Sequence, residues 1–259
     1  ELGGGWAWRA AGYAGFRPAT LNELHRPFRV GNTLTEANPG LEPERLYGVE
    51  TGVDLARGPL TLAATVFRNR LENAITNVTL ATGPGTFAVP GLPGVSDVIG
   101  AGGFLRMREN AGAVDATGLE AEAVEAVLGD GLQLRAAVAY TYSVVDGGSA
   151  APQLDGLRPA LTPRATVTGE ARWRPTASTE LTLETRYESR RYDDDLNTLP
   201  LHAAISFDLQ ASYALTPALS LFLAADNLFD AGVQTAESAL GVYSYDAPRL
   251  VRVGVRLRR

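Results

Sequence analysis

The sequence predicts an all-β fold: an antiparallel transmembrane β-barrel segment of roughly ten strands. Apolar and polar residues alternate in its long segments, as in residues 250–258, where valines and a leucine fall on one face and arginines on the other. Long and tight connections also alternate along the chain. No run approaches the ~18–20 apolar residues of a transmembrane helix, so any membrane-spanning form must be a barrel.

Ten segments have the alternation and length of barrel strands. In residues 45–56, for example, Tyr47 and Val49 face one way while Gly48 and Glu50 face the other. A soluble β-sandwich would have shorter strands, about 5–6 residues long. The expected strands are residues 6–16, 45–56, 60–79, 104–128, 132–145, 164–174, 179–192, 201–215, 219–226 and 250–258.

The connections predict one rim of long loops and an opposite rim of tight turns. Glycine, proline and aspartate mark the tight turns, because these residues favour turn conformations. The expected turns are residues 57–59, 129–131, 175–178 and 216–218, and the expected loops are residues 17–43, 81–103, 146–162, 193–200 and 227–249. Antiparallel outer-membrane barrels have this asymmetry, with the long loops on the outer side.

One segment has two interpretations. Residues 119–128 are rich in good helix formers, but Glu120 and Glu122 alternate with Leu119, which favours a strand. The alternation slips at Ala123 and Val124, and we expect a β-bulge there.

Aromatic residues near strand ends favour a membrane-facing wall. They share the apolar parity, where a lipid-interface girdle would lie, although soluble core aromatics are the alternative. They are Trp6, Trp8, Tyr140, Tyr142, Trp173, Tyr187 and Tyr213.

Charged residues of both signs occupy the opposite, inward face. We expect them to pair between strands in a wet lumen; a transport pathway is the sharper alternative. They are Glu50, Asp54, Glu120, Glu122, Arg135, Glu170, Arg172, Glu184, Arg186, Asp208, Asp226, Arg252 and Arg256.

The candidate ligand-binding residues lie in an outer loop or the lumen. Arg26, Arg29 and Asn32 could hold an anionic ligand such as a ferric chelate, because arginine offers bidentate donors; a solvated loop is the alternative. Arg68 and Asn69, near one end of a long strand, complete the set.

The chemistry of other sites is limited. Residues 193–195, three consecutive aspartates, could bind calcium, but a charged surface loop is favoured because the spacing is not that of a calcium loop. We predict no metal site, no catalytic residue and no cofactor. The chain has 259 residues, no cysteine and a net charge of −6, so thiolate sites are excluded and nucleic acid is not an expected partner. Residues 227–230 are expected to mark a strand end and turn.

Four stretches together resemble a known family, the TonB-dependent outer-membrane receptors, in the C-terminal part of their barrel. Residues 15–50 resemble the family's GFRAPT-x-EL segment followed by N-P-x-L-x-P-E, and residues 109–122 resemble its N-x-G-x-A-x-x-x-G-x-E strand. Residues 226–230, DNLFD, resemble its N-L-F-D, and residues 248–257 resemble its terminal strand.

The resemblance implies that residues 1–259 are the C-terminal part of a larger, 22-stranded barrel, without the plug domain. It implies a receptor, not an enzyme, in the outer membrane of a Gram-negative bacterium. The implied partners are outer-membrane lipid, TonB and the plug through a missing N-terminal part, and a small-molecule ligand. A ferric siderophore is the favoured solute, with haem, cobalamin and glycans as rivals.

Three alternatives remain. The chain could be a self-contained ten-stranded barrel enzyme resembling the omptin proteases, for which His202 beside residues 193–195 would be the candidate site. It could be a small pore. A soluble β-rich binding module is the third, and solubility without detergent would identify it.

Overall fold

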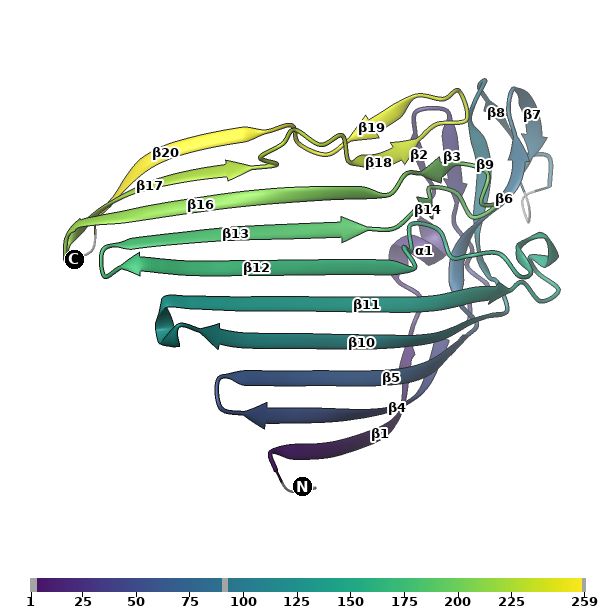
Figure 1. The fold of residues 1–259 in the computed structure, drawn as a ribbon. Coiled ribbons are helices and arrows are strands. Elements are labelled where there is room, and N and C mark those ends of the chain that lie inside the picture. The colour runs from purple at the N-terminus through teal and green to yellow at the C-terminus, as the bar shows by residue number, and fades with distance from the viewer. Residues whose placement is uncertain (1–3, 90–92, 258–259) are drawn as a thin grey trace.

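Ten strands form one antiparallel sheet in the computed structural model, which describes residues 4–89 and 93–257 (Figure 1). Each strand pairs with the next long strand of the chain, which confirms the predicted all-β meander. The strands are β1 (Trp6–Arg17), β4 (Glu44–Arg57), β5 (Leu60–Glu72), β10 (Ala113–Val127), β11 (Leu132–Asp146), β12 (Ala165–Thr176), β13 (Thr179–Glu188), β16 (Ala204–Thr216), β17 (Leu219–Asp226) and β20 (Leu250–Leu257).

The connections divide by length between the two ends of the sheet. Four short turns, one containing the 3₁₀ helix η1 (Gly129–Gly131), lie at one end, and five long loops lie at the other (Figure 1). The sheet is open in the described part of the chain, since β1 and β20 are its two edges. None of the helices in the described residues is long and apolar enough to cross a membrane.

The register gives the sheet one apolar and one polar face. Residues paired across antiparallel strands lie on the same face, so a row can be followed through successive strands. One apolar row runs through Trp8, Val53, Ala64, Ala121, Val138, Val167, Tyr187 and Ile205. The adjacent polar row runs through Arg9, Gly52, Thr65, Glu120, Ala139, Thr166 and Glu188. The predicted alternation is therefore confirmed across the sheet.

The long loops contain secondary structure of their own. A four-stranded sheet has the order β2 (Phe28–Val30), β3 (Thr33–Glu36), β9 (Phe104–Asn110) and β6 (Ile75–Thr82), with β3 and β9 parallel. The other loop elements are α1 (Leu21–His25), η2 (Pro152–Leu154) and the strand pairs β7 (Gly85–Ala88) with β8 (Ser96–Ile99), β14 (Arg191–Tyr192) with β15 (Pro200–Leu201), and β18 (Gln234–Glu237) with β19 (Tyr243–Tyr245). Residues 17–43 and 81–103, expected as structureless loops, are therefore partly ordered into strands.

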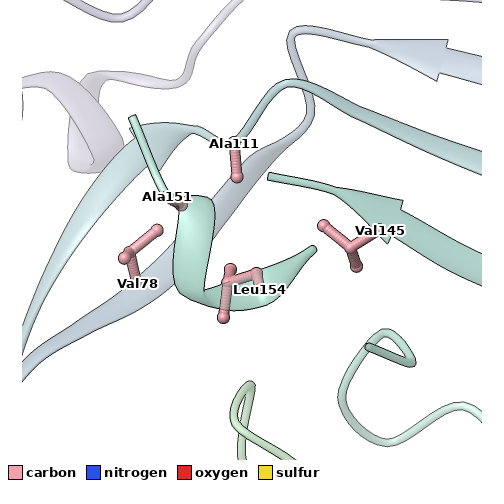
Figure 2. Packing of buried hydrophobic residues seen from close by; sticks show 5 residues of the cluster. All are labelled: Val78, Ala111, Val145, Ala151 and Leu154. Carbon is pink, nitrogen blue, oxygen red and sulfur yellow. The ribbon is translucent and has the colours of Figure 1, made fainter. Parts of the chain in front are cut away.

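The hydrophobic core lies at this loop end. One buried cluster joins residues from β6, β11 and η2, as Figure 2 shows. A second cluster joins Leu34, Ile99 and Leu105. The ten-stranded sheet instead leaves large apolar side chains exposed on its apolar face, such as Val53 and Tyr140. The loops thus bury apolar area against one another, while the wall needs an external apolar medium.

Two predicted strands are each two strands in the structure. The predicted strand 60–79 breaks after β5, where Asn73 adopts a left-handed φ of 54°, and β6 joins the loop sheet instead. The predicted strand 104–128 breaks at residues 111–112 into β9 and β10. Periodicity misses such breaks because both halves alternate.

The predicted bulge at Ala123 and Val124 is wrong. Both residues keep an unbroken register with β5 and β11, so the sequence pattern slips while the backbone does not. Residues 119–128 are mostly strand, as favoured over helix. Strand 179–192 ends earlier than predicted, at Glu188, and β16 begins at Ala204, so His202 does not begin a strand. Arg258, the last residue of the predicted closing strand, lies outside the described residues.

Candidate functional site

Charged side chains on the polar face pair across neighbouring strands. Arg9 lies 3.1 Å from Asp54, and its guanidinium also donates to Thr65. Arg135 lies 2.8 Å from Glu122. These contacts confirm the predicted interstrand pairing. Because the paired charges are partly exposed, they make a hydrated surface and add little stability.

An open cavity of about 530 Å³ lies on this polar face where the strands meet the long loops. It is framed by the ends of β13 and β17, the start of β16 and the loop between β17 and β20. Arg186 and Arg191 both contact Glu188, and Asp208 and Asp226 add negative charge. A cavity with both signs of charge can hold a polar ligand through charge-assisted hydrogen bonds.

Two of the predicted ligand residues hold the β7–β8 hairpin and the turn that follows it. Arg29 lies 3.7 Å from Asp97 and donates to the carbonyl oxygen of Val98 at 3.3 Å. Asn32 donates to the carbonyl oxygen of Ala101 at 3.0 Å. The structure therefore brings Arg29 and Asn32 to the same segment, where both have protein partners.

Arg26 lies apart from that segment, at the C-terminal end of α1. A capping box between Thr20 and Glu23 starts this short helix, and Arg26 ends it with an exposed side chain. Its carbonyl oxygen accepts a hydrogen bond from Arg108 at 3.2 Å. Arg26 therefore presents its guanidinium to solvent at the loop end.

Arg68 and Asn69 project from opposite faces of β5. Asn69 accepts a 2.7 Å hydrogen bond from the Tyr13 hydroxyl on the polar face. Arg68 pairs in register with Val49 and Thr117 on the apolar face. The prediction that Arg68 reaches the lumen or an outer loop is therefore wrong, since successive residues of a strand alternate between faces.

The three consecutive aspartates are mostly buried, which corrects the favoured surface-loop interpretation. Asp194 is 1% exposed and accepts hydrogen bonds from Thr198 and from the backbone of Leu199. Asp195 accepts from Thr79, in a different loop. Burial raises the pKa of Asp193. In residues 4–89 and 93–257, no group of three or more His, Cys, Asp or Glu side chains is placed to hold a metal ion.

His202 is held by an amide. Its ring Nδ1 and its backbone nitrogen each lie 2.9 Å from Oε1 of Gln234. The carboxylates of Asp194 and Asp195 are meanwhile engaged by other donors. This arrangement gives no support to the hydrolase alternative, which needs a histidine oriented by a carboxylate.

The segment 227–230 is a turn, as predicted. Asn227 has a φ of 49°. Its side-chain Nδ2 donates to the carbonyl oxygen of Ala231 at 3.0 Å, and its side-chain Oδ1 accepts from the backbone nitrogen of Ala231 at 2.8 Å. Asp208 accepts from the Asn227 backbone at 2.7 Å. Phe229 packs edge-on against Phe207.

A carboxyl pair that the sequence analysis did not identify lies beside Arg29. Burial raises the pKa of Glu36, and the neighbouring Asp97 raises it further. The two residues are 61 positions apart on separate hairpins, so no local pattern relates them.

Comparison with known proteins adds two findings. The model of a family described as "TonB dependent receptor-like, beta-barrel" matches residues 2–228. A sequence search of the curated proteins finds no significant match.

Solved structures share the fold at low sequence identity. The ferric yersiniabactin uptake receptor FyuA from Yersinia pestis aligns with a TM-score of 0.69 and 18% identity over 99% of this chain and 35% of its own length. A mutant ferric enterobactin receptor from Pseudomonas aeruginosa, in complex with enterobactin, gives 0.69 and 20% over 99% and 39%. The copper transporter OprC gives 0.68 and 14% over 97% and 37%. The chain thus spans little more than a third of the length of these proteins.

Proposed function

Because the chain belongs to the TonB-dependent receptor-like β-barrel family, we propose that it forms the C-terminal part of the barrel of an outer-membrane receptor for a scarce solute. The single observation that carries this proposal is the division of the chain into an apolar wall and a packed rim of long loops. Such a rim suits capture of a solute, and a charged, hydrated inner face suits its passage.

The proposed capture surface is the cavity on the polar face together with the exposed loop residue Arg26. Arg186 and Arg191 supply positive charge at the cavity, and Arg26 supplies it at the rim. Arginine is suited to anionic chelates because its planar group donates in pairs. Arg29, Asn32 and Asn69 contribute by holding the surrounding loops and wall in position.

The proposed solute is a ferric siderophore. The solved relatives support this class, since two of them are receptors for ferric yersiniabactin and ferric enterobactin. Copper is the competing cargo, because the copper transporter OprC shares the fold equally well. Haem, cobalamin and glycans remain alternative solutes, and the uptake assay described below includes them.

The proposed partners follow from the family. A plug domain would fill the lumen, TonB would supply energy through it, and outer-membrane lipid would cover the apolar face. The inner-face charges, such as Arg135 and Glu122, are partly exposed in this chain and would contact the plug.

The test is an uptake assay in cells that make the protein at its native length. We expect uptake of a radiolabelled ferric siderophore, such as ferric enterobactin or ferric yersiniabactin, to require both the protein and TonB. The other labelled solutes are copper, haem, cobalamin and a glycan. Uptake of one of these alone would reject the siderophore, and no TonB-dependent uptake of any would reject the receptor function.

A charge variant tests the cavity. Arg186→Gln should raise the half-saturating concentration of an anionic siderophore roughly tenfold, the size of one lost charge-assisted hydrogen bond. Arg57→Gln, at the end of β4 beside a tight turn at the opposite end of the wall, is the matched control. Equal effects of the two variants would exclude the cavity from binding.

A further inference from the structure

We propose that Arg68, Arg164 and Arg190 bind the phosphorylated headgroup of a lipid in the outer leaflet, on the outward side of the wall. The inference rests on the outer-membrane location proposed above, and it goes beyond solute uptake because it concerns the opposite face of the sheet.

Register places Arg68 on that face. A single row on the apolar face runs through Val49, Arg68, Thr117 and Tyr142, on four successive strands. Tyr142 is 49% exposed there. Two strand spacings separate Arg68 from Tyr142, about 10 Å between backbones.

Arg164 reaches the same place from the loop before β12. Its guanidinium lies 5.0 Å from the ring centre of Tyr142, and its carbonyl accepts a 2.8 Å hydrogen bond from the backbone of Thr141. The aromatic face holds the cation on the outward side of the wall.

Arg190 joins them from the loop after β13. Tyr192 lies in β14, which pairs with β15 apart from the ten-stranded sheet. Arg158 lies close enough to Tyr192, and to Tyr140 on the apolar face, for both to affect its pKa. The guanidinium groups of Arg190 and Arg158 lie 5.2 and 5.3 Å from the Tyr192 ring. Arg158 also donates to the Arg190 carbonyl at 3.0 Å, which ties the two loops together.

These arginines lack carboxylate partners. Among the described residues, no Asp or Glu lies within 4.0 Å of the guanidinium nitrogens of Arg68, Arg158, Arg164 or Arg190. Burial lowers the pKa of Arg158, and the positive charges of Arg164 and Arg190 lower it further. Like charges held close together are stabilised by an anion placed between them.

The position identifies the anion as a lipid headgroup. The cluster faces outward at the loop end, beside Tyr140 and Tyr142, which lie where interfacial aromatics meet headgroups. Surface arginines attract anionic lipid at this level. Inorganic phosphate would gain nothing from the exposed aromatic rings beside this outward-facing site.

The experiment measures lipid binding by the native-length protein purified in detergent, using native mass spectrometry. The probes are a phosphorylated glycolipid, the same glycolipid after enzymatic removal of its phosphates, and inorganic phosphate. The test variant carries Arg68→Gln, Arg164→Gln and Arg190→Gln. The control carries Arg57→Gln, Arg135→Gln and Arg256→Gln, the same change in charge at the tight-turn rim, where Arg135 and Arg256 lie on the polar face and Arg57 ends β4.

We expect the phosphorylated lipid to bind the native protein and the control equally, and the test variant about a hundredfold more weakly, at roughly tenfold or less per arginine. Lysine at the three test positions should retain most of the binding, which separates loss of charge from loss of folding. Equal binding by the test variant, equal binding of the dephosphorylated lipid, or displacement by inorganic phosphate would each overturn the proposal. Solute uptake is measured separately, so failure here leaves the proposed transport untouched.

Discussion

Thr79 donates two hydrogen bonds to the carboxylate of Asp195, one from its backbone nitrogen at 2.8 Å and one from its hydroxyl at 2.7 Å. Both residues are buried, and 116 positions separate them in the chain. The pair joins the loop after β13 to strand β6 of the loop sheet. Arg106 also donates to the Thr79 hydroxyl, at 3.3 Å. The rim of loops is therefore held together by buried polar contacts as well as by apolar clusters.

Asp195→Ala should loosen this connection. The substitution leaves the buried Thr79 N–H without its acceptor, which costs about 1–3 kcal/mol. Amide hydrogen exchange in β6, followed by mass spectrometry, should become roughly tenfold to a hundredfold faster. Asp155→Ala, at an exposed aspartate of another loop, is the control. Unchanged exchange in β6 would show that the pair does not hold the loops together.

Gly48→Ala should destabilise the wall. The Tyr13 ring lies over Gly48, and a Cβ there would come within 2.2 Å of the ring and 2.4 Å of the Asn69 oxygen. Moving the tyrosine breaks its hydrogen bond to Asn69, so we expect a loss of about 1–3 kcal/mol in the free energy of unfolding, measured with urea.

Gly15→Ala provides the control for this prediction, because nothing lies within 4 Å of a Cβ added there. In a Tyr13→Ala background the cost of Gly48→Ala should largely disappear, since the clashing ring is gone and the Asn69 side chain, no longer bonded to Tyr13, can turn away. The same cost in both backgrounds would mean that the ring is not the cause.

The contact between the β2–β3 and β7–β8 hairpins should tighten as pH falls. Burial, then Asp97, raises the pKa of Glu36, so the folded state binds the proton more tightly than the unfolded state does. Its stabilising effect is complete below the usual value of 4.5 and is lost as pH rises above it. Hydrogen exchange in β8 should therefore be slowest at and below pH 4.5, and faster once pH rises through the raised pKa of Glu36, after correction for intrinsic rates.

Glu36→Gln should remove that pH dependence, because the amide does not titrate. Asp97→Asn should reduce it but not abolish it, since burial of Glu36 remains the larger cause. An unchanged pH profile in Glu36→Gln would assign the effect to another group.

Asn227→Ala should weaken the start of the last long loop. It removes the side chain's hydrogen bonds to Ala231 and to the carbonyl of Ala247, and it places alanine at a φ of 49°. We expect a loss of about 2–3 kcal/mol in unfolding free energy from the two effects together. Asn227→Gly relieves the backbone strain alone and should lose less. Equal losses would show that only the hydrogen bonds matter.

The sequence by itself determined the wall. A period of two is a local property of each strand, so the two faces, the meander and the division into tight turns and long loops followed from residue patterns. The interstrand pairing of charges followed as well, because inward positions share one face. The structure confirmed each of these in the part of the chain that it describes.

Only the tertiary structure decided how the loops pack at the rim and which residues surround the outward arginines. Parallel pairing of β3 with β9, burial of Asp195 and the meeting of Arg164 with Tyr142 depend on where separate segments come together in space. Loop residues have no period, and their partners are far away in the chain. Alternation along the strand was enough to assign the face of Arg68. It could not identify the residues beside Arg68 on adjacent strands, because register is set by contacts between strands and not within one.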